Sequence, residues 1–348
     1  MVKVLAHIVV HGAYPYLETV IAALQQLDGE FLLNIEITEN GGFLPASCGL
    51  DQLCERSGVA LFRNQINMGF SAAHNQAAFR FVRADYDYLL ILNPDLALER
   101  GALQAMIDSY QQRERESIYL CPLLLRATET LTPIIPETID SAGIEFTSTL
   151  RHFDRYAEQK LKEVSLCSGH IVGGSGACLL FSRQAVQQLV LPVLEHNEAL
   201  YDVFPQLRVG TEERLELFDE SFFAYREDAE LALRAKALGV RGYLNVDARG
   251  YHVRQVTPER RESLAADINC HSVRNRFLLQ ILHWSPLRNP SSIVPGFFVR
   301  NLLVILGVLF RERSSLPAFR QVFVLWKRAW MRRLYIKSYN LARDGTHA

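Results

Sequence analysis

A short apolar run ends at an acidic residue early in the chain. The segment Tyr88–Leu92, YLLIL, has the continuous apolar pattern of a buried parallel strand, and Asn93-Pro94-Asp95 follows it directly. In open α/β sheets ligands bind beyond the carboxyl ends of the strands, so the Asp95 carboxylate is predicted to project into a site. A carboxylate there can bind a hard divalent cation that bridges a diphosphate. The simpler alternative is an Asx turn that only ends the strand.

Two adjacent acidic residues, Glu227 and Asp228, stand at the start of a predicted helix that Gly239 ends. A helix N-terminus favours an ionised carboxylate, which is the form that a general base needs. Acidic residues in a first helical turn are also ordinary partners of the helix dipole, so this alternative stays open. His252 ends the next predicted strand, where an imidazole is either a metal ligand or a structural residue.

The composition is that of a globular chain without a strong charge preference. The chain has 348 residues, a net charge of −1 and 49% apolar residues, enough for a large core and one or two domains. The near-neutral charge gives no support for nucleic-acid binding. Six cysteines are scattered without a CxxC pair, which predicts free thiols in a reducing compartment. The apolar N-terminal run is predicted to be a first strand rather than a signal peptide.

Strand-like and helix-like stretches alternate in the first half of the chain. The predicted strands are 4–10, 32–38, 59–63 and 88–92, and the predicted helices are 16–27, 50–57, 71–83 and 101–112. This alternation predicts an α/β domain with a doubly wound, mostly parallel sheet. Ser71 is expected to cap its helix, and residues 122–164 are expected to form loops and short strands.

Five segments together resemble the family 2 glycosyltransferases, and more closely the bacterial rhamnosyltransferase-type members that build surface polysaccharides. The segments read NMGFSAAHNQA, DYLLILNPD, SGACLLFSRQA, FDESFFAYREDAELALRAKALG and DARGYHV, and the resemblance covers about Val4–Arg276. It implies a GT-A fold and inverting transfer of a sugar from a nucleotide-diphosphate donor to a glycan or lipid-linked glycan acceptor. We place the glycosyltransferase domain at 1–256, with a nucleotide-binding half at about 1–115 and an acceptor half at about 116–256, and a C-terminal helical region at 257–348.

The resemblance implies roles for the residues that can do chemistry. It implies that Asp95 holds Mg²⁺ or Mn²⁺ against the donor diphosphate, with Asn93 in place of a first acidic residue, and that His252 is a further metal ligand. Such a cation stabilises the negative charge that develops on the leaving nucleotide diphosphate. Asp228 is then the expected base that takes the proton of the acceptor hydroxyl, with Glu227 as the second candidate.

The nucleotide end of the predicted site departs from the family pattern. The first strand ends in Val10-His11-Gly12 in place of a Thr-Tyr-Asn-like triplet, and the second ends in Glu39-Asn40-Gly41-Gly42 in place of Asp-Asn-Ala-Ser. Glu39 can still accept a hydrogen bond from a base N–H or a ribose hydroxyl. The other predicted contacts to the nucleotide sugar are Asn67, Gly69, Asn75, Gly176 and Ala177. His74 is expected at the surface.

The C-terminal region is basic and aromatic. Arg274 and Arg276 match a polar cluster of the family and are predicted to hold a diphosphate of the donor or of a lipid carrier, with a solvated helix face as the alternative. Nine basic residues and one acidic residue lie between Arg311 and Arg343, interleaved with aromatic residues. This pattern is typical of a helix on an anionic membrane surface. The alternative is a helical pair that covers the sheet or forms a homo-oligomer.

These expectations describe a peripheral protein on the cytoplasmic, inner face of a bacterial cell membrane. The longest late apolar run, Leu302–Phe310, lies between Arg300 and Arg311 and is shorter than the ~20 residues of a transmembrane helix, so no spanning helix is expected.

Two rival functions are considered. A nucleotidyltransferase would need a Gly-rich signature with Lys or Arg after the first strand, and the chain has none there. A catalytically weak or inactive family member that serves as a binding subunit is favoured by the altered residues at 10–12 and 39–42. The retention of four residues together, Asp95, Glu227, Asp228 and His252, argues against that second rival.

Overall fold

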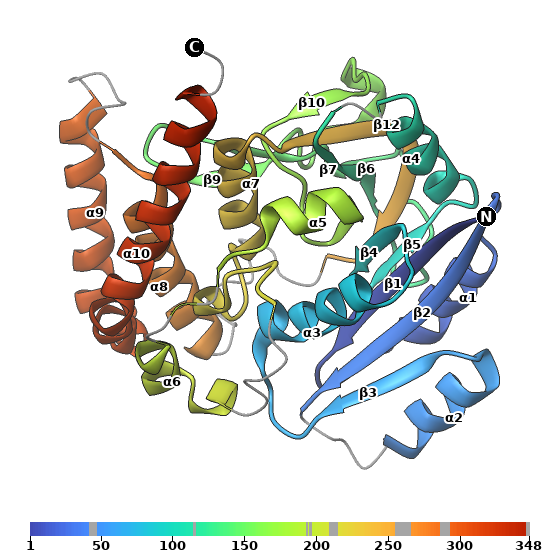
Figure 1. The fold of residues 1–348 in the computed structure, drawn as a ribbon, viewed down its shortest axis with the longest axis horizontal. Helices are drawn as coiled ribbons and strands as arrows, with labels where there is room; N and C mark the ends of the chain where they lie inside the picture. Colours follow the sequence, from blue (N-terminus) through green and yellow to red (C-terminus); the bar gives the residue numbers. More distant parts are fainter. Residues whose placement is uncertain are drawn as a thin grey trace.

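The computed structural model describes residues 1–348 except 42–46, 114–115, 193, 195–196, 209–214, 255–265, 286–292 and 346–348. Its centre is a ten-stranded mixed sheet in the order β10-β12-β6-β11-β4-β1-β2-β3, with β5 beside β12 and β7 beside β6 (Figure 1). Helices flank the sheet, and three long C-terminal helices stand together at one side of the molecule.

The amino-terminal half is the parallel α/β unit that the sequence predicts. Its elements are β1 (Val2–Val10), α1 (Leu17–Gln25), β2 (Phe31–Asn40), α2 (Ser47–Ser57), β3 (Ala60–Asn64), α3 (Gly69–Arg83), β4 (Tyr88–Leu92), β5 (Leu96–Leu98) and α4 (Ala102–Gln111). β1 pairs in parallel with both β2 and β4, so the carboxyl ends of these three strands lie side by side at the same end of the sheet. All four predicted strands and all four predicted helices are confirmed, with ends that shift by a few residues.

Alternate residues of the central strand β1 pack into two different hydrophobic clusters. Val4, Ala6 and Ile8 belong to the cluster that holds residues of α1, α2 and α4, whereas Leu5 belongs to the cluster that holds residues of α3. Successive side chains of a strand point to opposite faces, so α1, α2 and α4 cover one face of the sheet and α3 covers the other. This burial on both faces explains why the strand is a continuous apolar run.

The carboxy-terminal half of the sheet is mixed. Its strands are β6 (Ile118–Arg126), β7 (Ile139–Ser141), β10 (Gly169–Ile171), β11 (Cys178–Ser182) and β12 (Arg241–His252), and β8 (Ile144–Phe146) and β9 (His152–Asp154) form a separate pair. β11 is antiparallel to β4 and β6, while β12 is parallel to β6 and antiparallel to β5. The helices of this half are α5 (Arg183–Leu189), α6 (Glu198–Val203) and α7 (Glu227–Leu238).

One local prediction is confirmed in part and another is wrong. Residues 122–164 contain the expected loops and the short strands β7, β8 and β9, but 122–126 complete the longer strand β6. Pro122 pairs with Asn245, next to the point where the β12 register shifts, and sheets tolerate a proline at such an irregularity. Ser71 does not cap α3, because the helix begins at Gly69, and the buried Ser71 hydroxyl has no hydrogen-bond partner in the described part of the chain.

The C-terminal region consists of α8 (Ala266–His283), α9 (Ile293–Phe310) and α10 (Pro317–Gly345). α10 packs against α8, α6 and α7. α9 stands at the left edge of Figure 1, and only 11% of it is buried. Among the described helices α9 is the one long and apolar enough to cross a membrane, which corrects the expectation that no apolar segment has that length.

Candidate active site

Asp95 lies in the short link between β4 and β5, at the carboxyl end of the central strands. The Asn93 N–H, just past the end of β4, donates to the Ala177 carbonyl at 2.9 Å. The Asp95 carbonyl accepts a hydrogen bond from the Val253 N–H at 3.0 Å, so the link is fixed on both sides. The Asp95 side chain is 13% exposed. The backbone of this link is therefore fixed, and the partly exposed Asp95 carboxylate stays accessible at the carboxyl ends of the strands.

His252 is the last residue of β12 and faces Asp95. Its Nε2 lies 3.3 Å from Asp95 Oδ1, and its Nδ1 lies 2.8 Å from Asp140 Oδ2. Asp140, on β7, is buried beside the guanidinium groups of Arg126 and Arg254. Burial opposes the charged imidazole, but the two acidic partners outweigh burial and raise the pKa of His252 to about 9. Sequence reasoning missed Asp140, because it stands in a segment without a recognisable motif.

Asp95 and His252 fit a divalent cation when the imidazole has lost its proton, since only the neutral imidazole can be a metal ligand. The buried Nε2 atom of His252 has no hydrogen-bond partner among the described residues, although a carboxylate oxygen lies close to it. Asp140 holds the other ring nitrogen, as a carboxylate often does behind a metal-binding histidine. Two protein ligands leave the other positions of a Mg²⁺ or Mn²⁺ ion for diphosphate oxygens and water. The described ranges contain no group of three or more His, Cys, Asp or Glu side chains that could hold a metal ion.

Glu227 and Asp228 form the first turn of α7 in different environments. The half-buried Asp228 carboxylate accepts hydrogen bonds from the N–H groups of Gly176, at 3.0 Å, and Ala229, at 2.7 Å. Burial raises the pKa of Asp228, and these N–H groups oppose that rise. Glu227 is buried, and its Oε2 has no hydrogen-bond partner among the described residues. Burial and then the charge of Asp228 raise the pKa of Glu227, so Asp228 is the ionised member of the pair.

Replacing Glu227 by Gln should reduce the pH dependence of the free energy of unfolding. Native Glu227 titrates at about pH 8 and its reference pKa is 4.5, so between these values the native state holds an extra proton. Stability therefore falls as pH rises through this window, and Glu227→Gln removes that fall. Denaturant titrations from about pH 5 to about pH 8 should show the variant gaining stability relative to wild type. The exposed Glu55→Gln serves as the control, and parallel curves for wild type and Glu227→Gln would contradict the assignment.

The segment before the acid pair has an unusual backbone. Three non-glycine residues have positive φ angles: Phe223 (61°), Tyr225 (70°) and Arg226 (67°). Such conformations cost energy and persist only when the surrounding structure holds them. Asn275 of α8 donates to three carbonyls of segment 222–225, at 2.6 to 2.8 Å, and Arg274 donates to one of them at 2.7 Å. These two side chains therefore position the start of α7.

The structure places the two predicted diphosphate arginines differently. Arg274 is fully buried, and its guanidinium also bonds to His271, Asn275 and Gln321. Burial lowers the pKa of Arg274 to about 9. Its donors are engaged within the protein, which suits a positioning residue rather than a diphosphate ligand. Arg276 does not contact segment 222–225 and instead donates a hydrogen bond to Asn301 of α9 at 3.0 Å.

Four predicted nucleotide-binding residues, His11, Asn40, Asn67 and Gly69, come together beyond the ends of β1 and β2. His11 Nδ1 lies 3.1 Å from the Asn40 carbonyl, and His11 Nε2 lies 3.3 Å from Asn67 Nδ2. Asn40 Nδ2 donates to Asn67 Oδ1 at 3.0 Å and to the Gly69 carbonyl at 3.2 Å. Gly69 has a φ of +82°, and a Cβ there would lie 2.6 Å from the Phe223 carbonyl oxygen, so only glycine fits.

Three other predicted residues at this end of the site have distinct surroundings. Val10 is buried in the core, and Gly12 has a positive φ with open space around it. Glu39 is buried, and its carboxylate accepts a hydrogen bond from Arg63 Nε at 2.7 Å. Arg63 also pairs with Asp51 at 2.8 Å. Sequence reasoning missed Arg63, which already binds Glu39, the residue expected to bind the base or the ribose.

Two residues of α3 bond within the protein interior. Asn75 Nδ2 donates to the Phe218 carbonyl and Asn75 Oδ1 accepts from the Phe218 N–H, both at 2.9 Å, so this side chain is not part of the His11 cluster. His74 is fully buried, and its Nδ1 lies 2.8 Å from Nδ1 of His7 on β1. The expectation that His74 lies at the surface is wrong, because α3 turns this side chain toward the sheet.

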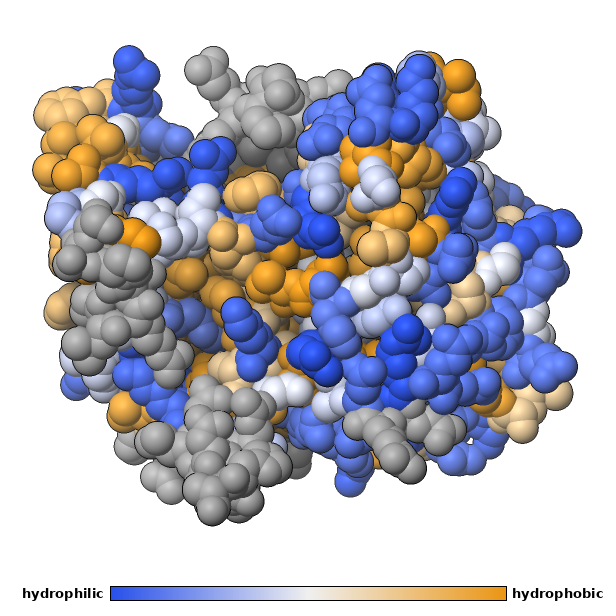
Figure 2. All heavy atoms as spheres, turned by 90° about the horizontal axis from the view of Figure 1, so that it is seen from above, coloured by the Kyte–Doolittle hydropathy of each residue, from blue (hydrophilic) through white to orange (hydrophobic). Residues whose placement is uncertain are grey.

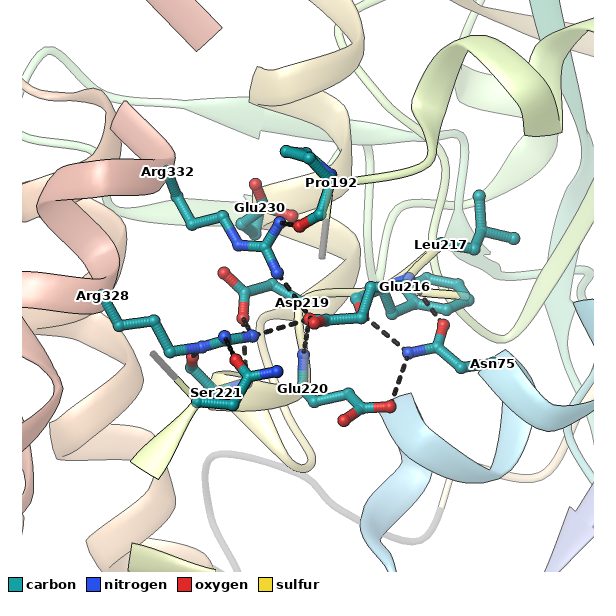
Figure 3. A network of polar contacts seen from close by, with 12 residues as sticks. Asn75, Pro192, Glu216, Leu217, Asp219, Glu220, Ser221, Glu230, Arg328 and Arg332 are labelled. Atoms are coloured by element: carbon teal, nitrogen blue, oxygen red, sulfur yellow. Dashed lines mark hydrogen bonds and ion pairs between the residues drawn. The ribbon is translucent and has the colours of Figure 1, made fainter. Parts of the chain in front are cut away.

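A buried ionic network joins α10 to the loop that leads to the acid pair (Figure 3). Arg328 and Arg332 each place a guanidinium nitrogen 2.7 Å from a carboxylate oxygen of Glu216, and Arg328 lies 3.6 Å from Asp219. Burial acts to raise the pKa of Asp219, but the charges of the two arginines outweigh burial and lower it. Arg328, Arg332 and Arg333 are all buried, whereas Arg320, Lys327 and Lys337 of the same helix are exposed, so only part of its basic residues can contact a membrane surface.

A cavity of about 690 Å³ lies at the amino ends of the parallel strands, opposite to the carboxyl ends that carry Asp95. Its lining includes Leu33 and Glu36 of β2, Val59 before β3, and Tyr86 before β4. None of the predicted site residues lines it, so this cavity is separate from the candidate active site.

Comparisons with known proteins bear on the fold. No family model matches the sequence, and no curated protein matches it. Among solved structures the chain is similar to GalNAc-T7, crystallised with UDP, GalNAc and Mn²⁺, with 12% identity and a TM-score of 0.57 over 82% of this chain and 48% of that chain. It is also similar to S. aureus TarS, with 12% identity and a TM-score of 0.47 over 98% of this chain and 53% of that chain.

The similarity to GalNAc-T7, with the sheet described above, defines the class of fold. The central, mostly parallel sheet flanked by helices is that of the GT-A glycosyltransferase fold, as the sequence predicts. The chain spans about half the length of each of the two solved structures. At 12% identity the likeness shows the fold alone, so the activity follows from the residues of the site.

Proposed function

We propose that this protein is a metal-dependent, inverting glycosyltransferase that moves a sugar from a nucleotide-diphosphate donor to a glycan or lipid-linked glycan acceptor of the cell envelope. The observation that supports it is that one short segment, 176–177, connects the two parts of the site. This segment bonds to Asn93, next to the Asp95–His252 pair, and also to Asp228. A cation site and a proton acceptor are thus fixed to the same piece of backbone. The likeness of the motifs to rhamnosyltransferase-type enzymes supports rhamnose as the sugar.

The proposal gives each residue a separate task. When bound to Asp95 and His252, Mg²⁺ or Mn²⁺ would stabilise the negative charge of the departing nucleotide diphosphate. Asp228 takes the proton of the acceptor hydroxyl while the hydroxyl oxygen attacks the anomeric carbon of the donor sugar. The N–H groups of Gly176 and Ala229 keep the Asp228 carboxylate in position. Glu227, which holds its proton, adds no second negative charge beside the base.

The proposal also places the protein at the cytoplasmic face of a bacterial membrane, attached through its C-terminal region. The support is a set of exposed apolar side chains on α9 and α10: Phe298, Leu303, Phe310, Phe323, Trp326 and Trp330. Large exposed apolar patches mark surfaces that contact a membrane or another protein. A second copy of the chain, in a homo-oligomer, is the competing occupant of this surface.

Calorimetric titration with UDP, dTDP and GDP tests the donor site. Each nucleotide is added with Mn²⁺ and again with a chelator. One nucleotide that binds only with the metal supports the proposal and names the donor class, and Asp95→Ala should then lose this binding. Metal-independent binding that survives Asp95→Ala contradicts the metal role. Binding of none of the three favours the inactive binding subunit, which the altered residues at 10–12 and 39–42 also motivate.

Replacing Asp140 by Asn should weaken Mn²⁺ binding about 10- to 100-fold, because Asp140 fixes the ring that presents His252 Nε2. Electron paramagnetic resonance of free and bound Mn²⁺, with the nucleotide present, measures this without any assay of transfer. Asp154→Asn is the matched control, since Asp154 also pairs with Arg254 but forms no hydrogen bond or ion pair with His252 in the described part of the chain. Equal Mn²⁺ affinities in the two variants would remove Asp140 from the metal site.

A further inference from the structure

Three arginines from separate segments form a cationic cluster beside α9. Arg276 belongs to α8, Arg300 to α9 and Arg151 to the turn between β8 and β9. Arg276 is only 9% exposed and donates to Asn301 Oδ1 at 3.0 Å. The Nε atoms of Arg276 and Arg300 have no hydrogen-bond partner among the described residues. Gln280, one turn after Arg276, donates to the Thr149 carbonyl at 3.4 Å and to Asn301 Oδ1 at 3.2 Å, so the segment before Arg151 and the residue after Arg300 both lie against this part of α8. Burial and then the charges of Arg300 and Arg151 lower the pKa of Arg276 to about 10.

The cluster lacks the counter-charge that other buried arginines of this chain have. Arg234 pairs with Glu230 at 2.9 Å, and Arg328 pairs with Glu216 at 2.7 Å. Across the described ranges, no acidic side chain forms an ion pair with any member of the arginine cluster. Partly buried cations without a counter-charge are costly, and an anionic ligand would relieve that cost.

The cluster borders an exposed apolar surface. In the helix that carries Arg300, Val299, Leu303 and Phe310 are 56%, 62% and 74% exposed. Figure 2 shows apolar side chains gathered at the left edge of the molecule, where α9 lies in Figure 1. Trp284 at the end of α8 stacks on Phe297 of α9, with ring centroids 3.6 Å apart, so α9 is anchored by its opposite side. Its exposed apolar side therefore faces away from the protein.

The cluster also lies on the acid-pair side of the candidate site. His152 follows Arg151, and its Nδ1 lies 3.2 Å from Arg226 Nη1. Arg226 directly precedes Glu227. α9 stands on the other side of the molecule from β1, β2 and β3, which carry the predicted nucleotide end (Figure 1). An anion on the cluster would thus approach from the acceptor side rather than from the donor side.

We propose that Arg151, Arg276 and Arg300 bind the phosphate group of an acidic membrane lipid whose hydrocarbon chains lie against α9. Guanidinium groups suit phosphate oxygens because their planar donors match them in pairs. A lipid explains both parts of the surface. A soluble diphosphate would leave the apolar side of α9 exposed, whereas a lipid covers this side and also supplies the negative charge. This inference deepens the membrane contact proposed above and rests on it.

Sedimentation with lipid vesicles tests the inference on the full chain. Vesicles of phosphatidylcholine alone are compared with vesicles that also contain phosphatidylglycerol, which carries the phosphate and a net negative charge. The double variant Arg151→Gln/Arg300→Gln should bind the acidic vesicles less tightly than wild type, by about fivefold for each guanidinium removed. The matched control, Arg100→Gln/Lys162→Gln, removes two exposed cations elsewhere and should bind as wild type does.

The remaining arms identify the source of the phosphate. Inorganic pyrophosphate should compete only weakly, because it offers nothing to the apolar side of α9, and Leu303→Asn should weaken binding to both kinds of vesicle. Equal losses in the test and control variants would overturn the arginine site. Tight pyrophosphate binding with no vesicle binding would show a soluble ligand and also overturn it. Metal-dependent nucleotide binding, measured on the same variants, should be unchanged, so failure of this inference and failure of the proposed transfer activity are distinguishable.

Discussion

Asp228→Asn should lower the rate of sugar transfer by about two to four orders of magnitude while leaving nucleotide affinity nearly unchanged. Asparagine keeps the shape of the side chain and can still accept a hydrogen bond from the Gly176 N–H, so the turn that carries it should survive. It cannot accept the proton of the acceptor hydroxyl. Single-turnover transfer, with the nucleotide affinity measured separately by calorimetry, separates the two effects.

Glu227→Gln is the matched control for Asp228→Asn. It changes the neighbouring carboxyl by the same substitution but removes a group that already holds its proton, so transfer should fall far less. Transfer by Asp228→Asn at a rate comparable with wild type would show that Asp228 is not the base. A larger loss in Glu227→Gln than in Asp228→Asn would move that role to Glu227.

The second large effect concerns stability. Glu216→Gln should lower the free energy of unfolding by about 3–5 kcal/mol, because it leaves two buried guanidinium groups, Arg328 and Arg332, short of negative charge. Urea denaturation measures the loss. Glu198→Gln provides the comparison, since Glu198 pairs with Arg208 at the surface and such pairs contribute less than about 1 kcal/mol. Losses of similar size in the two variants would contradict a dominant role for the buried network.

The parallel half of the fold could be predicted because each of its signals is local. Continuous apolar strands and periodic helices appear within single windows, and the ends of the strands locate Asp95 and His252. The full length of the strand at 118–126 could not be predicted, because Pro122 normally disfavours a central strand and is tolerated here beside the register shift of β12. That shift depends on a partner more than a hundred residues away.

The site contacts that sequence reasoning missed act across similar distances. Asp140 reaches His252 from β7, and it stands in no motif that could be read at its own position. Asn275 belongs to the polar cluster of Arg274 and Arg276, but its bond to the Tyr225 carbonyl joins residues 50 positions apart and has no local signal. Arg328 shows the same limit, since a local count groups it with the exposed basic residues of α10, whereas its counter-charge, Glu216, comes from a distant segment.

The buried network also restricts how the protein can be engineered. Deleting α10 to obtain a more soluble enzyme would leave Glu216 and Asp219 buried without their cations, beside the loop that leads to the catalytic helix. Such a truncation should yield aggregates or an inactive chain rather than a minimal catalyst. Solubility is better sought by polar replacement of exposed side chains such as Phe310 and Phe323, each about three-quarters exposed. The helix that looks most dispensable in the sequence is thus the one to keep.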